Sequence, residues 1–138
     1  MKNISILGCG WLGLPLAKSL LSKGFSVKGS TTSLDKISLL QNTGMEAFQI
    51  ALSKNKISGE IDSFLSNSEI LIIDIPPKLR GNTAENFVAK IELLIPFIEK
   101  AKVEKLLFVS STSVYSDDNS TITEETNPQP DSESERQL

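Results

Sequence analysis

The residues best suited to chemistry in this sequence form a glycine-rich segment near the N-terminus. Gly8, Gly10 and Gly13 follow a short β-rich run at residues 2–7, and residues 11–23 have the apolar spacing of a helix. Between a strand and a helix, G-x-G-x-x-G is typical of a turn that binds the pyrophosphate of a dinucleotide. The first glycine permits a tight turn, the second lets phosphate approach the backbone, and the third lets the helix lie close. The amides of the helix N-terminus then face the phosphates.

We therefore predict a dinucleotide site formed by Gly8, Cys9, Gly10, Trp11, Leu12 and Gly13. The alternative is a strand-to-helix turn whose glycines serve packing alone. Cys9 is interpreted as a small residue that faces the ligand or the core, and Trp11 is expected to pack against the first helix.

The segment about twenty residues past the glycines indicates which dinucleotide is bound. An NAD site usually has Asp or Glu there, because the carboxylate binds the ribose hydroxyls. Residues 29–33 contain no acid, and Ser30, Thr31 and Thr32 provide hydroxyls, with Lys36 one helical turn away. Since these groups suit a 2′-phosphate, we predict NADP, with NAD as the alternative. A polar turn that caps the next helix would have the same composition.

A second group of polar residues follows the run at residues 106–109, where Ser110, Ser111 and Tyr115 occur. Ligands of parallel sheets bind at the carboxyl ends of the strands, so these hydroxyls are expected near a bound substrate. Asp74 occupies a similar place near the end of the apolar run at 69–75. Its carboxylate is either an acceptor for nearby amides or a group close to the ribose.

The glycine segment, the Ser-Ser…Val-Tyr pattern at 110–115 and the Glu…Pro pattern at 124–130 together resemble the extended short-chain dehydrogenase/reductase family, the NAD-dependent epimerase/dehydratase group. The resemblance implies that Ser111 polarises a substrate carbonyl and is the catalytic residue. It also implies that the cofactor's nicotinamide side lies along residues near the ends of two strands, namely Ile75, Pro76, Pro77 and Ser110. The substrate would be a small molecule such as a nucleotide sugar or another carbonyl compound.

Two features depart from that family. Its catalytic Tyr-x-x-x-Lys pair would fall near Ser134 and Leu138, and Leu7 stands where extended members have a glycine. The leading hypothesis is an NADP-binding oxidoreductase or nucleotide-sugar epimerase-like protein. Because the Tyr and Lys are absent, a non-catalytic domain that senses NAD(P) or acts as a scaffold is the alternative.

Composition excludes several other classes of function. The 138 residues include no histidine and one cysteine, which excludes histidine bases, most zinc chemistry and an intrachain disulfide. Residues 1–116 carry 13 basic and 10 acidic side chains, and this small excess gives no support to nucleic-acid binding. No apolar run reaches the length of a membrane span, and no secretory signal is recognisable, so a cytoplasmic location is expected.

Alternating strands and helices must position these residues. Strands are predicted at 2–7, 25–29, 45–50, 69–75 and 106–109, and helices at 11–23, at 34–42 with Ser33 as cap, at 83–101 and, as a single turn, at 61–65. This alternation predicts an α/β fold: a doubly wound, Rossmann-like parallel sheet with strand order 3-2-1-4-5. We expect a dinucleotide-binding domain at 1–116 and, at 117–138, an acidic loop with the start of an unfinished helix. The substrate portion is expected to be absent, so the chain would be a cofactor-binding fragment.

Overall fold

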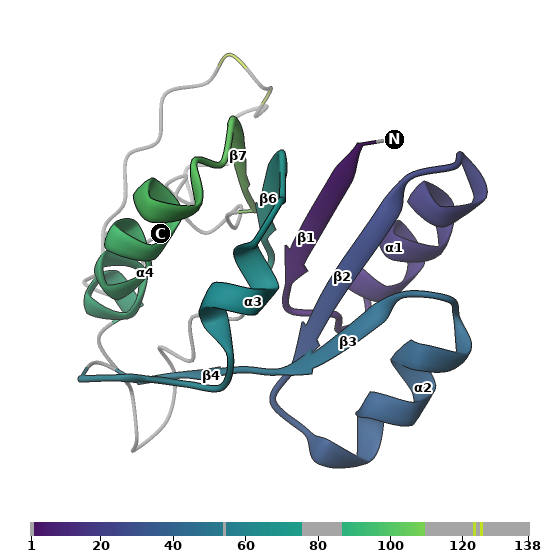
Figure 1. The fold of residues 1–138 in the computed structure, drawn as a ribbon, viewed down its shortest axis with the longest axis horizontal. Coiled ribbons are helices and arrows are strands. Elements are labelled where there is room, and N and C mark those ends of the chain that lie inside the picture. The colour runs from purple at the N-terminus through teal and green to yellow at the C-terminus, as the bar shows by residue number, and fades with distance from the viewer. Residues whose placement is uncertain (1, 54, 76–86, 110–122, 124, 126–138) are drawn as a thin grey trace.

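The computed structural model describes residues 2–53, 55–75, 87–109, 123 and 125, which form an α/β structure around one parallel sheet (Figure 1). The five strands lie in the order β3-β2-β1-β6-β7, and every neighbouring pair is parallel. Their bounds are Asn3–Leu7 for β1, Ser26–Thr31 for β2, Glu46–Gln49 for β3, Ile70–Ile73 for β6 and Lys105–Phe108 for β7. Since β6 and β7 are the fourth and fifth strands of this sheet, the predicted order 3-2-1-4-5 is confirmed.

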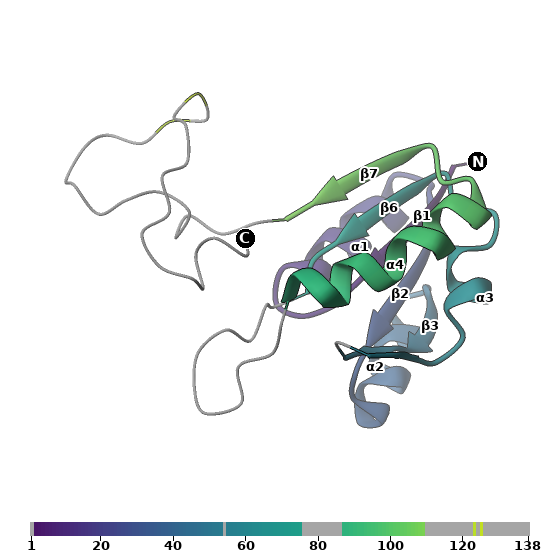
Figure 2. The same cartoon turned by 90° about the vertical axis from the view of Figure 1, so that its left-hand side faces the viewer.

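Helices cover both faces of the sheet, as the two groups in Figure 1 and Figure 2 show. The helices are α1 (Gly13–Ser22), α2 (Ile37–Asn42), α3 (Ile61–Leu65) and α4 (Phe87–Ala101), with a 3-10 turn at Leu34–Lys36 before α2. Two apolar cores result, one beneath α1 and α2 and one beneath α3 and α4. Strand β6 contributes to both cores, Ile72 to the first and Leu71 and Ile73 to the second, which explains its continuous apolar sequence.

The differences from prediction concern boundaries and one small addition. Strand β2 extends beyond Gly29 because Ser30 and Thr31 are paired with Phe48 and Gln49 of β3. A two-stranded antiparallel sheet, β4 (Ala51–Leu52) with β5 (Ile57–Ser58), was not predicted, whereas the single helical turn at 61–65 is confirmed as α3. Ser33 occupies the N-cap position, as predicted, but it caps the 3-10 turn and its side chain makes no cap hydrogen bond. The predictions for 76–86 and for the acidic tail lie outside the described residues.

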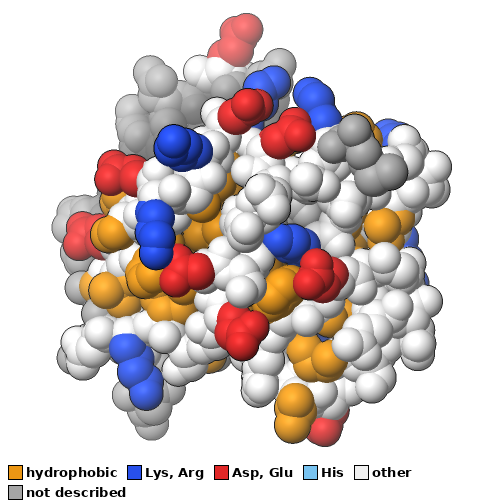
Figure 3. All heavy atoms as spheres, viewed as in Figure 1, with side chains coloured by type: hydrophobic (Ala, Val, Ile, Leu, Met, Phe, Trp, Pro, Cys, Tyr) orange, Lys and Arg blue, Asp and Glu red, His pale blue; other side chains and the backbone are white. Residues whose placement is uncertain are grey.

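The surface of the described part carries acidic and basic side chains interspersed over the face seen in Figure 3. Within residues 2–53, 55–75 and 87–109, none of the helices combines the length and the apolar character needed to cross a membrane.

The chain leaves β1 towards β2 and β3 and later returns on the other side of β1 as β6. The order of strands therefore reverses between β1 and β6, which is the position where open parallel sheets bind ligands.

Candidate functional site

The glycine turn, residues 8–13, connects β1 to α1 at the point where the strand order reverses. Leu7 ends β1, and α1 begins at Gly13, two residues later than the sequence indicated. The turn is flanked by the carboxyl ends of β2 on one side and β6 on the other. One residue of β2, Ser30, and one residue directly after β6, Asp74, fix the turn through hydrogen bonds.

Ser30 holds the turn from β2. Its hydroxyl oxygen accepts a hydrogen bond from the Gly8 amide at 2.9 Å, and its carbonyl oxygen accepts one from the Cys9 amide at 2.8 Å. Ser30 is only 2% exposed. The side chain predicted to contact a 2′-phosphate is thus already engaged in fixing the glycine turn.

Asp74, the residue after the end of β6, fixes the turn on the other side. Its backbone amide donates to the Leu7 carbonyl at 2.8 Å, and its carboxylate accepts a hydrogen bond from the Gly13 amide. Burial raises the pKa of this carboxyl group, and the hydrogen bond from Gly13 opposes that shift. Of the two roles considered for Asp74, the structure therefore provides the first, an acceptor for a nearby amide.

Two of the three glycines are required by the chain itself. Gly8 has a φ of +101°, and a Cβ there would lie 2.4 Å from the Asp74 carbonyl oxygen. A Cβ on Gly13 would lie 2.2 Å from the Gly8 carbonyl oxygen and 3.3 Å from the Asp74 Oδ2. A side chain cannot approach a carbonyl oxygen to 2.4 Å or 2.2 Å, so these two positions need glycine for packing.

Gly10 differs from the other two glycines. A Cβ at this position would meet no atom within 4 Å, and its φ is not in the positive region. Folding of the described chain therefore gives no reason for glycine at this position. A bound group that approaches the backbone would give one.

The backbone amides of the turn divide into two sets. Those of Gly8, Cys9 and Gly13 are used by Ser30 and Asp74. In the part of the chain that the structure describes, the amides of Gly10, Trp11 and Leu12 make no hydrogen bond, and Leu12 caps α1 without a side-chain bond. Three successive free amides at a helix N-terminus form an anion-binding arrangement.

The side chains of the turn are oriented in opposite ways. Trp11 is 90% exposed and Leu12 is 40% exposed, so the expectation that Trp11 packs against the first helix is wrong. Cys9 is buried beneath the turn, with its Sγ 2.7 Å from the position of a Cβ on Gly29. Burial raises the pKa of the Cys9 thiol to about 11, the Asp74 charge adds to the rise, and a hydrogen bond with the Ser30 backbone lowers it. The thiol is therefore protonated at neutral pH, which excludes a reactive thiolate.

The end of β2 presents the remaining predicted phosphate contacts. Thr31 is buried, and its hydroxyl oxygen accepts a hydrogen bond from the Ser33 amide at 3.2 Å. Thr32 and Lys36 are exposed. Of the four residues predicted to face a 2′-phosphate, these two have side chains available to a ligand.

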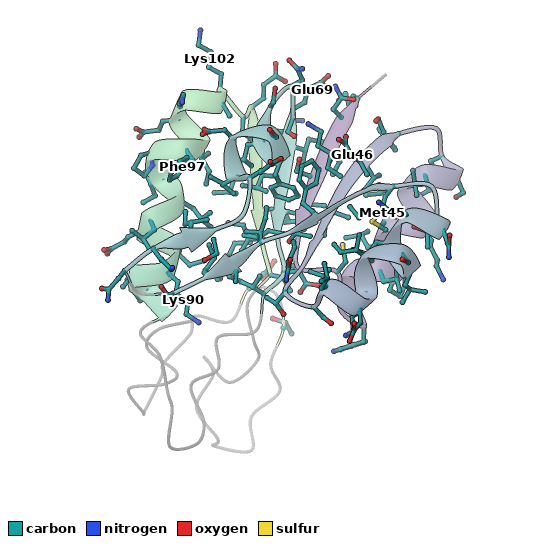
Figure 4. The ribbon with its side chains drawn as sticks, turned by 60° about the horizontal axis from the view of Figure 1, so that its bottom comes forward. Met45, Glu46, Glu69, Lys90, Phe97 and Lys102 are labelled. Atoms are coloured by element: carbon teal, nitrogen blue, oxygen red, sulfur yellow. The ribbon has the colours of Figure 1, made fainter. Side chains whose placement is uncertain are left out.

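The other predicted site residues lie at or beyond the ends of β6 and β7. Ile75 is half-buried and packs against the core beneath α3 and α4, whereas Pro76, Pro77, Ser110 and Ser111 fall outside the described residues. A buried charged residue that was not predicted is Lys90, in the first turn of α4 and labelled in Figure 4. Its spacing, four residues before the buried Leu94, was the available signal.

Comparison with known proteins gives sequence relatives and a shared fold. No family model matches the chain. Protein YeeZ of Escherichia coli, in strains K12 and O157:H7, is 31% identical over 140 aligned positions, which cover all of this chain and 51% of YeeZ. The chain thus spans about half the length of the curated relatives it matches.

Solved structures share the architecture, and two of them are enzymes or enzyme-like proteins that bear on the site. The UDP-N-acetylglucosamine 4-epimerase from Bacillus cereus has a TM-score of 0.69 and 18% identity, covering 95% of this chain and 48% of the epimerase. MoeE5, solved in complex with UDP-glucose and NAD, has a TM-score of 0.67 and 20% identity, covering 93% of this chain and 42% of MoeE5. The chain therefore has the same Rossmann-like fold as these two proteins, the fold that its sequence resemblance implied.

Proposed function

We propose that this chain binds NADP(H) through the glycine turn, as the nucleotide-binding portion of an oxidoreductase or nucleotide-sugar epimerase-like enzyme. The observation that carries the proposal is Gly10, a glycine that neither its backbone conformation nor packing against the described residues requires. It lies beside the free amides of Trp11 and Leu12, where an approaching pyrophosphate would use both the space and the donors. The solved structure of MoeE5 with NAD has the same fold and supports a nicotinamide dinucleotide.

The chain's own residues would divide the work of binding. The amides of Gly10, Trp11 and Leu12 would hold the two phosphates, while Ser30 and Asp74 keep the turn in shape. Beyond β2, exposed Thr32 and Lys36 would contact the 2′-phosphate that distinguishes NADP from NAD, with no carboxylate between residues 29 and 33 to repel it. The nicotinamide, when bound, supplies hydride transfer.

Intrinsic fluorescence gives a direct test, because Trp11 is the sole tryptophan and lies in the proposed site. Addition of NADPH is expected to quench Trp11 emission and shift it to shorter wavelength, since the bound dinucleotide covers an indole that is now exposed to water. Titrations should give a lower Kd for NADPH than for NADH, by about tenfold for one additional charged contact. Unchanged emission, together with no binding by calorimetry, would contradict nucleotide binding at this turn.

A matched pair of lysine variants tests the source of the NADP preference. Lys36→Ala is expected to reduce the ratio of the Kd for NADH to the Kd for NADPH, because it removes the cation nearest the proposed 2′-phosphate. Lys23→Ala removes the same charge at the far end of α1 and should leave the ratio unchanged. Equal Kd values for NADPH and NADH in the unmodified protein would exclude NADP specificity and leave NAD as the cofactor.

We further propose that Ser111, by its place in the family pattern, contacts the substrate carbonyl, with Ile75, Pro76, Pro77 and Ser110 along the nicotinamide side. In a full-length protein that oxidises NADPH with a nucleotide sugar or another carbonyl compound, Ser111→Ala should lower kcat about 100-fold. NADPH affinity should change little. Ser113→Ala, which removes a neighbouring hydroxyl, is the control, and equal kcat values for the two variants would remove Ser111 from the mechanism.

One observation favours a second function, a non-catalytic domain that senses NAD(P). The positions of the family's Tyr-x-x-x-Lys pair fall near Ser134 and Leu138, neither of which is Tyr or Lys, and a serine without a neighbouring base cannot replace a phenol whose pKa is lowered by lysine. Both functions predict nucleotide binding. Hydride transfer to a carbonyl or sugar substrate by the full-length protein would separate them.

A further inference from the structure

A carboxylate lies beside the amides that would bind phosphate. The Asp74 carboxylate accepts a hydrogen bond from the Gly13 amide, and its Oδ2 is 3.3 Å from the position of a Cβ on Gly13. Gly13 directly follows Leu12, whose amide is one of the three that remain free. An anion of the chain and an anionic ligand would therefore share one helix N-terminus.

The described chain offers little compensation for this negative charge. It gives Asp74 no ion pair, and the titratable group beside it is the Cys9 thiol, which carries no positive charge. The Gly13 amide is occupied, so it is not available to a ligand. Since the repulsion between like charges grows with the charge of the ligand, Asp74 must affect highly charged anions more than weakly charged ones.

We propose that Asp74 is a specificity-determining residue that selects dinucleotides against nucleotides and phosphates of higher charge. In a dinucleotide each phosphate of the pyrophosphate is a diester with a single charge, whereas the terminal phosphate of ADP carries about one charge more near neutral pH. The Asp74 carboxylate would tolerate the first and disfavour the second. This inference rests on the proposed function, because it requires a pyrophosphate on the amides of Gly10, Trp11 and Leu12.

The test compares two ligands that share the adenosine diphosphate group, ADP-ribose and ADP, at pH 8 and low salt. We expect the protein to bind ADP-ribose more tightly than ADP. In Asp74→Asn the side-chain oxygen can still accept the Gly13 hydrogen bond, but the charge is gone. Affinity should then rise about threefold for ADP-ribose and about tenfold for ADP. The ratio of the Kd for ADP to the Kd for ADP-ribose should therefore fall about threefold.

Two controls separate charge from structure. Glu104→Gln makes the same charge change just before β7, at the amino-terminal end of the parallel strands, whereas Asp74 lies at their carboxyl-terminal end. This variant should leave the ratio of the Kd for ADP to the Kd for ADP-ribose unchanged. In the unmodified protein, higher salt should also lower the ratio of the Kd for ADP to the Kd for ADP-ribose, because salt screens the repulsion between Asp74 and the phosphates. This measurement needs no variant. Asp74→Ser, a second neutral variant with an acceptor oxygen, replaces Asp74→Asn if thermal melting shows that the amide variant does not fold.

The outcomes distinguish this inference from the proposed function. If the unmodified protein binds ADP-ribose but its preference over ADP is unchanged in the neutral variants, Asp74 does not determine specificity and the proposed site stands. A weaker affinity for both ligands in the folded neutral variants would also overturn the inference, because it would show that the carboxylate assists binding. If the unmodified protein binds neither ligand, nor NADPH, the proposed function itself fails.

Discussion

Gly13→Ala is expected to lower the free energy of unfolding by about 3 kcal/mol or more. The new methyl carbon would lie 2.2 Å from the Gly8 carbonyl oxygen, a backbone atom that cannot rotate away. Relief requires Gly8 to move, and Gly8 is held by the Ser30 hydroxyl at 2.9 Å. The strain therefore spreads to the junction of β1, β2 and α1. Urea denaturation followed by circular dichroism would measure the loss as a lower midpoint at unchanged slope.

Gly24→Ala is the matched control for this prediction. Gly24 has a φ of +92°, but a Cβ there would meet no atom within 4 Å. The control therefore contains the cost of placing alanine in the left-handed region, about 1–2 kcal/mol, without a steric clash. If Gly13→Ala costs no more than Gly24→Ala, the close approach of α1 to the turn is not what requires glycine at position 13.

The sheet could be predicted from the sequence because its central strands are fully covered. The near-continuous apolar run that became β6 is buried on both faces, and that requirement leaves a strong pattern. The pair β4 and β5 could not be predicted, since strands of two residues are too short to show periodicity. The extension of β2 to Thr31 depends on pairing with β3, and no local signal in residues 29–31 reports such a contact.

The candidate site was predicted as a set of residues, but not as a division of roles. The glycine spacing identified the turn, yet only the three-dimensional contacts distinguish Gly10, which has open space, from Gly8 and Gly13, which do not. Ser30 was predicted from its chemistry as a phosphate contact. Its hydrogen bond to Gly8 joins residues 22 apart in the sequence and follows from the register of β1 with β2. A hydroxyl that serves the fold and one that serves a ligand are identical in a sequence.

The same division of roles makes Gly10→Val the sharpest test of nucleotide binding. Because a side chain at this position meets no atom of the described chain, the free energy of unfolding should change by less than about 1 kcal/mol. The branched side chain would nevertheless occupy the space through which a pyrophosphate reaches the amides of Trp11 and Leu12. Affinity for NADPH should fall about 100-fold or more, which corresponds to about 2.7 kcal/mol.

Trp11 fluorescence titration and a thermal melt on the same samples would measure the affinity and the stability of this variant. Gly10→Ala, with a smaller side chain, should give an intermediate loss of affinity, because the obstruction grows with the volume placed above the amides. A Gly10→Val protein that is stable and binds NADPH normally would mean that no ligand approaches the backbone at this position. The proposed function would then lose the observation that carries it. A stable variant that has lost NADPH would show that Gly10 serves the ligand, whereas Gly8 and Gly13 serve the fold.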